Sequence, residues 1–119
     1  MAWSLLIVDD HPDFRRAARD LLASDQFVVV GEAAGAVEAV AFATALEPGL
    51  VLLDVRLPDG DGFSVAESLA RLSRPPVVVL TSSHDAAMFR DRLAVAPVRG
   101  FLPKAELSVQ SLAHLVGRS

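Results

Sequence analysis

The sequence predicts a doubly wound α/β domain, in which a parallel five-stranded sheet is covered by helices on both faces. Five short runs of branched aliphatic residues recur along the chain, and helical patterns separate them at a spacing of roughly 20 to 25 residues. Hydrophobic residues make up 52% of the sequence, which suits a sheet buried on both faces. Strands that alternate with helices imply right-handed crossovers, so the sheet should be parallel. The length of 119 residues is that of one domain, and we expect residues 1–119 to hold no second domain.

The first half of the chain should hold three strands and two helices. The strands are expected at Leu5–Val8, Phe27–Val30 and Leu50–Leu53. Pro12 suits the first position of a helix. The residues of that helix expected to face the core are Phe14, Ala17, Ala18, Leu21 and Leu22. A second helix opens at Gly35 and ends at Pro48-Gly49, and its expected inner stripe is Val37, Val40, Ala41 and Ala45.

The second half should add two strands and three helices. After a turn at Pro58–Gly62, a third helix is expected to bury Phe63, Ala66, Leu69 and Ala70 and to end at Arg74-Pro75-Pro76. The strands are expected at Val77–Leu80 and Val98–Leu102. The fourth helix, over about 85–95, has the weakest pattern, with Met88, Phe89 and Leu93 as its apolar residues. Ser108 can cap the last helix, with Leu107 and Leu112 as a hydrophobic staple and an inner face of Val109, Leu112, Ala113 and Val116.

Composition excludes several classes of protein. The net charge is −4, and the eleven Lys and Arg residues are scattered, which argues against nucleic-acid binding by this domain itself. There is no cysteine, so disulfides and thiolate metal sites are excluded. No apolar run approaches the roughly 20 residues that a membrane helix needs, so no membrane association is expected. The first apolar run is too short for a signal peptide and lacks a basic leader, so we expect a cytoplasmic protein.

Polar residues follow four of the five predicted strands. Asp9 and Asp10 follow the first strand, Asp54 the third, Thr81 the fourth and Lys104 the fifth. Parallel strands place their carboxyl ends at one edge of the sheet, where open α/β sheets bind ligands, so these side chains should converge. Three carboxylates in one cleft repel one another by about 4 kcal/mol per pair at ~4 Å, and one lysine cannot neutralise them. The cluster therefore predicts a divalent cation, and oxygen ligands favour Mg²⁺.

The hydroxyl and the ammonium of this cluster suggest its chemistry. A phosphoryl group needs hydrogen-bond donors and positive charge around its oxygens during transfer, and Thr81 and Lys104 could supply both. A carboxylate at the end of a buried strand, such as Asp54, can act as a nucleophile. The predicted site therefore combines a carboxylate nucleophile, a metal and two oxyanion-stabilising side chains.

With these residues in view, the chain resembles a response-regulator receiver domain of two-component signalling over essentially its whole length. The segments that carry the resemblance are Leu6-Ile7-Val8-Asp9-Asp10-His11-Pro12, Leu53-Asp54-Val55-Arg56-Leu57-Pro58-Asp59-Gly60-Asp61-Gly62, Thr81-Ser82 and Gly100-Phe101-Leu102-Pro103-Lys104. The resemblance implies a flavodoxin-like (βα)5 fold with strand order 2-1-3-4-5. It also implies that residues 1–119 form a receiver, or phosphoacceptor, domain.

The same resemblance implies a role for each site residue. Asp54 would accept a phosphoryl group from the phosphohistidine of a sensor histidine kinase or of a phosphotransfer protein. Mg²⁺ would be held by Asp54, by Asp10 with or through Asp9, and by the backbone carbonyl of Arg56. Thr81 and Lys104 would bind the phosphoryl oxygens. Phe101 matches the aromatic residue whose rotamer follows the switch, which would change the surface formed by the fourth helix, the fifth strand and the fifth helix.

The opening Asp-Asp-His-Pro segment and the non-proline residue after Lys104 most resemble receivers that precede a LuxR-type helix-turn-helix output domain. The resemblance thus implies an output that is transcriptional, with DNA bound only by an output domain outside this chain, and a homodimer as one possible assembly. Two features depart from the family pattern. Ala94–Val98 is longer than usual before the fifth strand, which bears on the output surface, and Ala105 follows Lys104 in place of a frequent proline.

Two other readings stay open. A degenerate receiver would keep the fold as a protein-interaction module but would not switch. A phosphatase of the haloacid-dehalogenase type also uses an aspartyl nucleophile, but it needs a second acid two residues later, where this chain has Arg56 after Asp54 and His11 after Asp9. Because receivers are switches, the resemblance implies no enzyme beyond self-catalysed phosphotransfer and dephosphorylation. His11 and His84 lack metal-ligand spacing, so both are expected on the surface.

Overall fold

The computed structural model describes residues 2–117 and contains one five-stranded parallel sheet. Its strands are β1 (Trp3–Val8), β2 (Phe27–Ala33), β3 (Leu50–Asp54), β6 (Val77–Ser82) and β7 (Gly100–Pro103). The strand order is β2-β1-β3-β6-β7, and every neighbouring pair is parallel. The predicted order 2-1-3-4-5 is therefore confirmed, with β6 and β7 as the fourth and fifth strands of the sheet.

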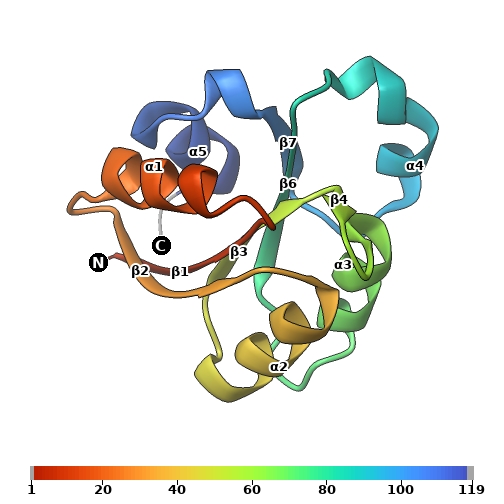
Figure 1. Ribbon diagram of the computed structural model, residues 1–119, viewed down its shortest axis with the longest axis horizontal. Coiled ribbons are helices and arrows are strands. Elements are labelled where there is room, and N and C mark those ends of the chain that lie inside the picture. The colour runs from red at the N-terminus through yellow and green to blue at the C-terminus, as the bar shows by residue number, and fades with distance from the viewer. Residues whose placement is uncertain (1, 118–119) are drawn as a thin grey trace.

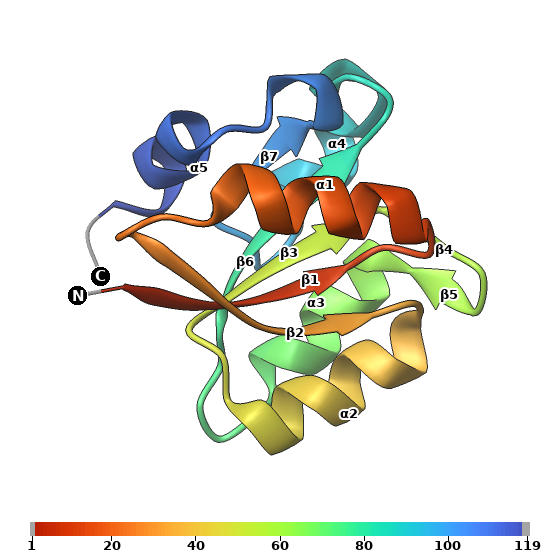
Figure 2. The ribbon, with the colours of Figure 1, turned by 60° about the vertical axis from the view of Figure 1, so that its left-hand side comes forward.

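Helices cover both faces of the sheet, as predicted (Figures 1 and 2). Helices α1 (Pro12–Leu22) and α5 (Val109–Val116) pack on one face, and α2 (Ala36–Leu46), α3 (Gly62–Ala70) and α4 (Arg90–Val95) pack on the other. Two short 3₁₀ helices, η1 (Ala86–Phe89) and η2 (Lys104–Glu106), complete the set. None of the helices described within residues 2–117 has the length and apolarity that a membrane crossing requires.

The central strands have two buried faces, which explains their unbroken aliphatic runs. Along β1, Leu5 and Ile7 belong to the core under α1 and α5, whereas Leu6 and Val8 belong to the core over α2 and α3. Every residue of β3 is buried. Successive side chains point to opposite faces of the sheet, and both faces are buried, so every side chain within these strands is apolar. A polar side chain can be placed only at the end of such a strand.

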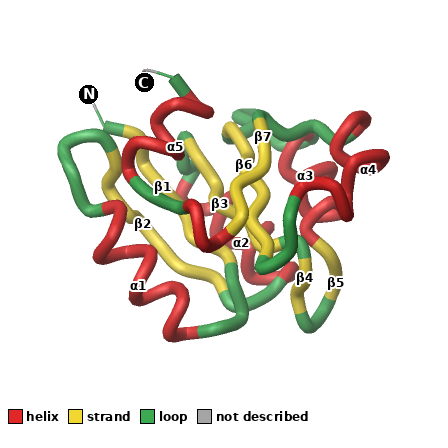
Figure 3. Tube along the Cα trace, turned by 90° about the horizontal axis from the view of Figure 1, so that it is seen from above, coloured by secondary structure: helices red, strands yellow, loops and turns green. Residues whose placement is uncertain are grey.

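A small antiparallel hairpin follows β3, where the sequence predicted only a turn. It consists of β4 (Arg56–Leu57) and β5 (Gly60–Asp61). Figure 3 shows the hairpin outside the main sheet and next to α3. The hairpin closes tightly, since the N–H of Gly62 donates to the carbonyl of Val55 at 2.7 Å.

The predicted inner stripe of α2 was mostly wrong. Ala39 and Ala43 are the buried residues of this helix, and Val40 packs against the core, but Val37 is 72% exposed. Ala41 and Ala45 also face solvent. The helix is apolar on almost every side, so its periodicity does not single out one face. Small alanine side chains lie against the sheet because α2 packs closely there: a Cβ added at Gly31 of β2 would come within 2.9 Å of Leu46.

The other helices followed prediction with smaller differences. In α1, Ala18 and Leu22 are buried and Phe14 is partly buried, but Ala17 and Leu21 are exposed. In α3, Val65 is buried although the sequence pattern did not predict it, Ala70 is exposed, and the helix ends at Ala70, before the predicted stop at Arg74-Pro75-Pro76. The predicted cap of α5 is confirmed, because Ser108 accepts from the backbone N–H of Ser111 at 2.9 Å and both Leu107 and Leu112 are buried.

The fourth helix is the least regular element. The segment predicted as one helix over about 85–95 is split into η1 and the six-residue α4. Phe89 is buried at the junction, whereas Met88 is 56% exposed. The strand after it begins at Gly100, two residues later than predicted, although the N–H of Arg99 already bonds the carbonyl of Val78 at 2.7 Å. The long Ala94–Val98 segment thus serves as the connection into β7.

Candidate functional site

The predicted site residues meet at one edge of the sheet. Asp54 ends β3 and lies beside Thr81 in the register of β3 and β6. Asp9 follows β1, and Lys104 follows β7. The ammonium nitrogen of Lys104 lies 2.6 Å from Oδ2 of Asp9 and 3.4 Å from Oδ2 of Asp54. Four separate strands therefore deliver the carboxylates, the hydroxyl and the ammonium to the same place.

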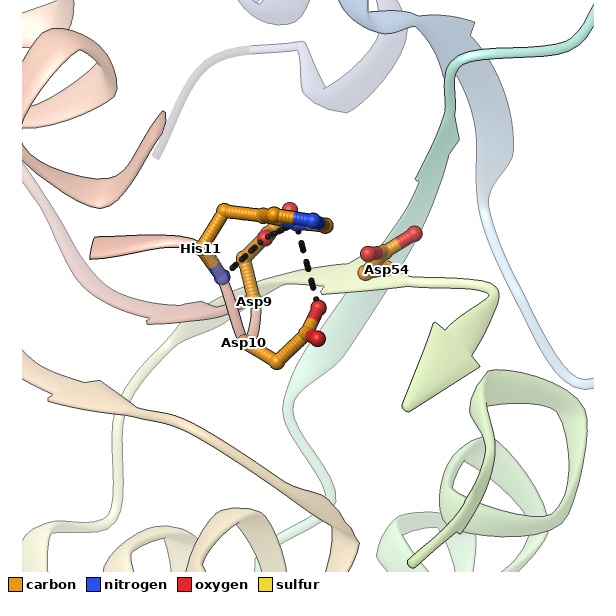
Figure 4. Close-up of side chains that lie close together, drawn as sticks. All are labelled: Asp9, Asp10, His11 and Asp54. Atoms are coloured by element: carbon orange, nitrogen blue, oxygen red, sulfur yellow. Dashed lines mark hydrogen bonds and ion pairs between the residues drawn. The ribbon is translucent and has the colours of Figure 1, made fainter. Parts of the chain in front are cut away.

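Three carboxylates and one imidazole form a cluster that could hold a metal ion (Figure 4). Asp9, Asp10, His11 and Asp54 each offer one ligand atom, and these atoms lie within 4.8 Å of one another. Asp9 and Asp54 are buried, whereas Asp10 and His11 reach solvent. Three carboxylates at this separation fit a hard cation with oxygen ligands, such as Mg²⁺, since it would offset their mutual repulsion.

His11 belongs to this cluster, which the metal-ligand spacing in the sequence did not indicate. Its side chain is 68% exposed, so the predicted surface position is right. However, its backbone N–H donates to Oδ1 of Asp9 at 2.9 Å, and its ring Nδ1 lies 3.0 Å from the same oxygen and 3.2 Å from Oδ1 of Asp10. The imidazole therefore bridges the two neighbouring carboxylates. Its place two residues after Asp9 was the available signal, because an Asp side chain often bonds the backbone two residues on.

The two buried carboxylates differ in how easily they ionise. Burial works to raise the pKa of Asp9, but the ammonium of Lys104 and the hydrogen bonds from His11 outweigh it and hold that pKa below its ordinary value of 3.8. Burial raises the pKa of Asp54, the charge of Asp9 raises it further, and Lys104 and the N–H of Arg56 only partly offset this. Asp54 thus lacks enough positive charge around it, which a bound cation would supply.

Lys104 is held in place by an aromatic ring as well as by carboxylates. Its side chain is only 15% exposed, and its ammonium lies 4.4 Å from the ring centroid of Phe14 on α1. A cation above an aromatic face is attracted by the ring's quadrupole. Sequence reasoning had assigned Phe14 to the core alone, and nothing in the sequence linked a residue on the first helix to one after the fifth strand.

Thr81 carries a buried hydroxyl that is not satisfied within the protein. The residue is 1% exposed, and its Oγ1 has no hydrogen-bond partner among residues 2–117. A buried hydroxyl without a partner costs about 1–3 kcal/mol, so its presence calls for an explanation such as a bound ligand, ion or water. Because Thr81 lies next to Asp54, the hydroxyl is placed to serve a group attached to that carboxylate.

A cleft of about 270 Å³ opens above these residues. Its lining consists of Asp10, His11, Asp54, Arg56, Leu57, Pro58, Ser82, Ser83, His84 and Lys104. Asp9 and Thr81 are not part of this lining and are fully buried. Arg56, whose side chain is exposed, donates its backbone N–H to Oδ1 of Asp54 at 3.4 Å. Asp54 is therefore reachable from solvent through a polar cleft of small volume.

Phe101, the predicted switch residue, lies outside the cleft lining. It is partly buried in β7, and its ring centroid lies 5.8 Å from that of Phe89, which in turn lies 6.0 Å from that of Phe63. Arg92 of α4 stacks over Phe63 at 4.1 Å and pairs with Asp61 at 3.2 Å. A continuous set of contacts thus joins β7 to α4 and to the hairpin that follows Asp54.

Comparison with known proteins agrees with this geometry. Residues 5–116 match the family described as response regulator receiver domain. The chain is 44% identical over 97 residues to the DNA-binding transcriptional activator DevR/DosR of Mycobacterium tuberculosis, a match that covers 77% of this chain and 44% of that protein. The transcription regulator BvgA of Bordetella pertussis is 33% identical over 102 residues, covering 86% and 49%.

Solved structures give the same result. The signal receiver domain of the response regulator NarL from Mycobacterium tuberculosis superposes with a TM-score of 0.83 at 33% identity and covers 98% of both chains. A LuxR-family two-component response regulator from Aurantimonas sp. SI85-9A1 superposes with a TM-score of 0.85 at 28% identity, covering 99% of this chain and 88% of the other. The match spans about half the length of the two transcription regulators DevR/DosR and BvgA.

Proposed function

The chain belongs to the response regulator receiver domain family, and from this premise we propose that it is a phosphoacceptor switch whose Asp54 takes a phosphoryl group from a sensor histidine kinase or a phosphotransfer protein. The observation that carries the proposal is the position of Asp54. It is a buried carboxylate that lines a polar cleft and forms a cluster with the carboxylates of Asp9 and Asp10, with a lysine ammonium 3.4 Å away and an unsatisfied threonine hydroxyl beside it.

In the proposed reaction, one carboxylate oxygen of Asp54 attacks the phosphorus of a phosphohistidine. A P–O bond forms while the P–N bond breaks, and the imidazole keeps the electron pair and takes up a proton from water. Mg²⁺, held by the carboxylates of Asp9, Asp10 and Asp54 and by the backbone carbonyl of Arg56, would offset the negative charge of the phosphoryl oxygens. Lys104, whose ammonium lies 3.4 Å from Oδ2 of Asp54, adds a second positive charge.

The same residues would convert phosphorylation into a change of shape. A phosphoryl group on Asp54 offers acceptors that the buried hydroxyl of Thr81 lacks, so Thr81 would move toward it. Space vacated beside β6 would let Phe101 change position. Through Phe89 and Arg92, the surface of α4, β7 and α5 would then repack.

We further propose that the output is transcriptional. The two relatives compared above are transcription regulators about twice as long as the matched segment, so DNA would be bound by an output domain outside this chain. The net charge of −4 agrees with a domain that does not itself bind DNA. We propose a cytoplasmic location for the same reason, because a regulator that acts on bacterial DNA works in that compartment. A homodimer is part of the same proposal.

The proposal is tested by incubating the protein with a small phosphodonor and Mg²⁺ and measuring its intact mass. We expect one phosphoryl group per chain, lost in Asp54→Ala and kept in Asp13→Ala, whose side chain is 97% exposed on α1. No gain in mass, or a gain that survives Asp54→Ala, would contradict it. Small phosphoesters should not be turned over, which separates the switch from a haloacid-dehalogenase-type phosphatase.

A degenerate receiver is the second candidate, favoured by the short and irregular α4. It predicts that a beryllofluoride mimic of the phosphoryl group leaves amide exchange in α4 and β7 unchanged. The switch predicts that exchange in both elements changes, and that Asp54→Ala abolishes the response. The two candidates therefore differ in one measurement on the same protein.

A further inference from the structure

Arg15 links the Asp9 segment of the site to Glu32 on β2, the outermost strand of the sheet. It lies in the first half of α1 with a side chain only 17% exposed. One guanidinium nitrogen, Nη1, donates to the backbone carbonyl oxygen of Asp9 at 2.6 Å, and Nε donates to Oε1 of Glu32 on β2 at 3.0 Å. The side chain thus makes two directed hydrogen bonds to two different segments.

The carbonyl that Arg15 holds belongs to the peptide bond between Asp9 and Asp10. Both of these residues are proposed to hold the cation, and their carboxylates lie within the 4.8 Å cluster. The peptide follows the last residue of β1, where the N–H of Asp9 still bonds the carbonyl of Ala33 at 3.0 Å. Beyond that bond the chain leaves the sheet, so a displacement of this peptide would move the two residues that carry the carboxylates.

Glu32 holds Arg15 in the orientation that this contact needs. Its second oxygen, Oε2, accepts from Nε of Arg19 at 2.8 Å. The carboxylate is therefore fixed between two arginines one helical turn apart on α1, and Arg15 is the one whose guanidinium also reaches Asp9. A planar guanidinium can direct two donors at once, which a lysine ammonium does less well in this geometry.

We propose that Arg15, oriented by Glu32, is a positioning residue that fixes the Asp9–Asp10 peptide and thereby sets the two carboxylates for a divalent cation. The inference rests on the proposed function, because it concerns the Mg²⁺ site of the phosphoacceptor. Arg15 contacts no ligand oxygen of the cluster; it acts through the backbone. Residues that orient metal ligands in this way typically change metal affinity by about 10-fold or more when they are substituted.

The positive charge of Arg15 and its positioning role predict opposite effects on Mg²⁺ affinity, which allows a clear test. As a positive charge near the cluster, Arg15 disfavours a cation, so the loss of charge alone would tighten Mg²⁺ binding. As a positioning group, it favours the cation. Arg15→Lys keeps the positive charge and removes the planar guanidinium with its two directed N–H donors. Arg19→Lys is the matched control, since Arg19 is the same residue type on the same helix, bonds the same Glu32 and makes no hydrogen bond to Asp9.

Mg²⁺ alone is titrated into the full chain by calorimetry, with thermal unfolding measured in parallel. We expect Arg15→Lys to weaken Mg²⁺ binding by about 10-fold while Arg19→Lys keeps the wild-type affinity and the two variants unfold at similar temperatures. Equal affinities in the wild type and Arg15→Lys would overturn the proposal. Tighter binding by Arg15→Gln would also overturn it, because charge would then outweigh position.

A second readout does not depend on the metal. In metal-free protein, the carbonyl ¹³C resonance of Asp9 and the amide ¹⁵N resonance of Asp10 should move in Arg15→Lys and stay in place in Arg19→Lys. Unmoved resonances would overturn the positioning role. Absent Mg²⁺ binding in the wild type would instead contradict the proposed function. Should Arg15→Lys not fold, Glu32→Gln provides the same resonance test, since it removes the group that orients Arg15.

Discussion

The ammonium of Lys104 lies 2.6 Å from Oδ2 of Asp9, closer than it lies to Asp54. The lysine thus neutralises the more deeply buried carboxylate, whereas the pKa of Asp54 is raised by burial and by the charge of Asp9. A cation at the cluster would take over that neutralisation. Lys104 would then be free to bind the oxygens of a phosphoryl group on Asp54.

The first prediction follows from this ion pair. Lys104→Met, measured without added metal, should lower the free energy of unfolding by about 1–3 kcal/mol, because it removes the positive charge that neutralises the buried carboxylate of Asp9. The same substitution should tighten Mg²⁺ binding, since a competing positive charge is removed. Urea denaturation with and without Mg²⁺ measures both effects. Unchanged stability without metal would show that the pair contributes nothing.

The second prediction concerns Thr81. Thr81→Val should keep or raise stability, by up to about 1 kcal/mol, because it removes a buried hydroxyl that lacks a partner. The phosphorylated fraction at a fixed phosphodonor concentration should fall on the order of 10-fold, since one donor to the phosphoryl oxygens is lost. Thr44→Val is the control: its hydroxyl donates to the carbonyl of Val40 at 2.7 Å on the exposed side of α2, so phosphorylation should not change. A marked loss of stability in Thr81→Val would contradict this account.

The third prediction concerns Asp59, which caps α2 from the β4–β5 turn. Its two carboxylate oxygens accept from the N–H groups of Ala36 and Val37 at 2.6 and 3.1 Å. Gly35, at the N-cap position, has no side chain for this task, and a Cβ there would overlap Asp59. Asp59→Ala should therefore destabilise the protein at neutral pH.

The destabilisation caused by Asp59→Ala should decrease as the pH falls. The two backbone N–H groups lower the pKa of Asp59 below its ordinary value of 3.8. The stability difference between wild type and Asp59→Ala should thus be fully present above 3.8 and disappear as the pH falls through the lower folded-state pKa. Urea denaturation across this range measures it, with Asp13→Ala, which removes a 97% exposed carboxylate, as the control that should be less destabilised at neutral pH. A difference that instead grew on acidification would contradict the cap.

The fourth prediction concerns Gly62, directly after the hairpin. A Cβ at this position would overlap the backbone carbonyl oxygen of Asp54. Gly62→Ala should cost about 1–3 kcal/mol and also reduce phosphorylation, because the backbone that carries Asp54 must shift. Gly60→Ala is the milder control, since its Cβ would come 3.2 Å from the Cβ of Ala36, a side chain at the start of α2. Equal free energies of unfolding for the two variants would contradict the close contact between Gly62 and the backbone of Asp54.

The sequence was sufficient to predict the sheet and the convergence of the site. Runs such as Leu50–Leu53 are apolar because both faces of their strand are buried, so their positions are visible without a structure. Parallel strands then dictate that Asp54, Thr81 and Lys104 meet at one edge, and the register of β3 and β6 confirms this for the first two.

What the sequence could not predict depends on contacts between distant segments. The prediction of which face of α2 is buried was wrong, because a helix that is apolar on almost every side shows no preferred face in its sequence. Packing against the sheet buries the small residues Ala39 and Ala43. The cap that Asp59 provides to α2, the ring of Phe14 beside Lys104 and the bond from Arg15 to the Asp9 carbonyl each join elements far apart in the fold. Sequence patterns describe neighbours along the chain, so none of these contacts leaves a local signal.

The central claim is that Asp54 itself carries the phosphoryl group, and chemical mapping tests it most directly. After phosphorylation with Mg²⁺, borohydride reduces an aspartyl phosphate to homoserine, which peptide mass spectrometry assigns to one position. We predict homoserine at position 54 and aspartate unchanged at positions 9 and 10. Homoserine at either of those positions, or at none of the three in phosphorylated protein, would contradict the claim.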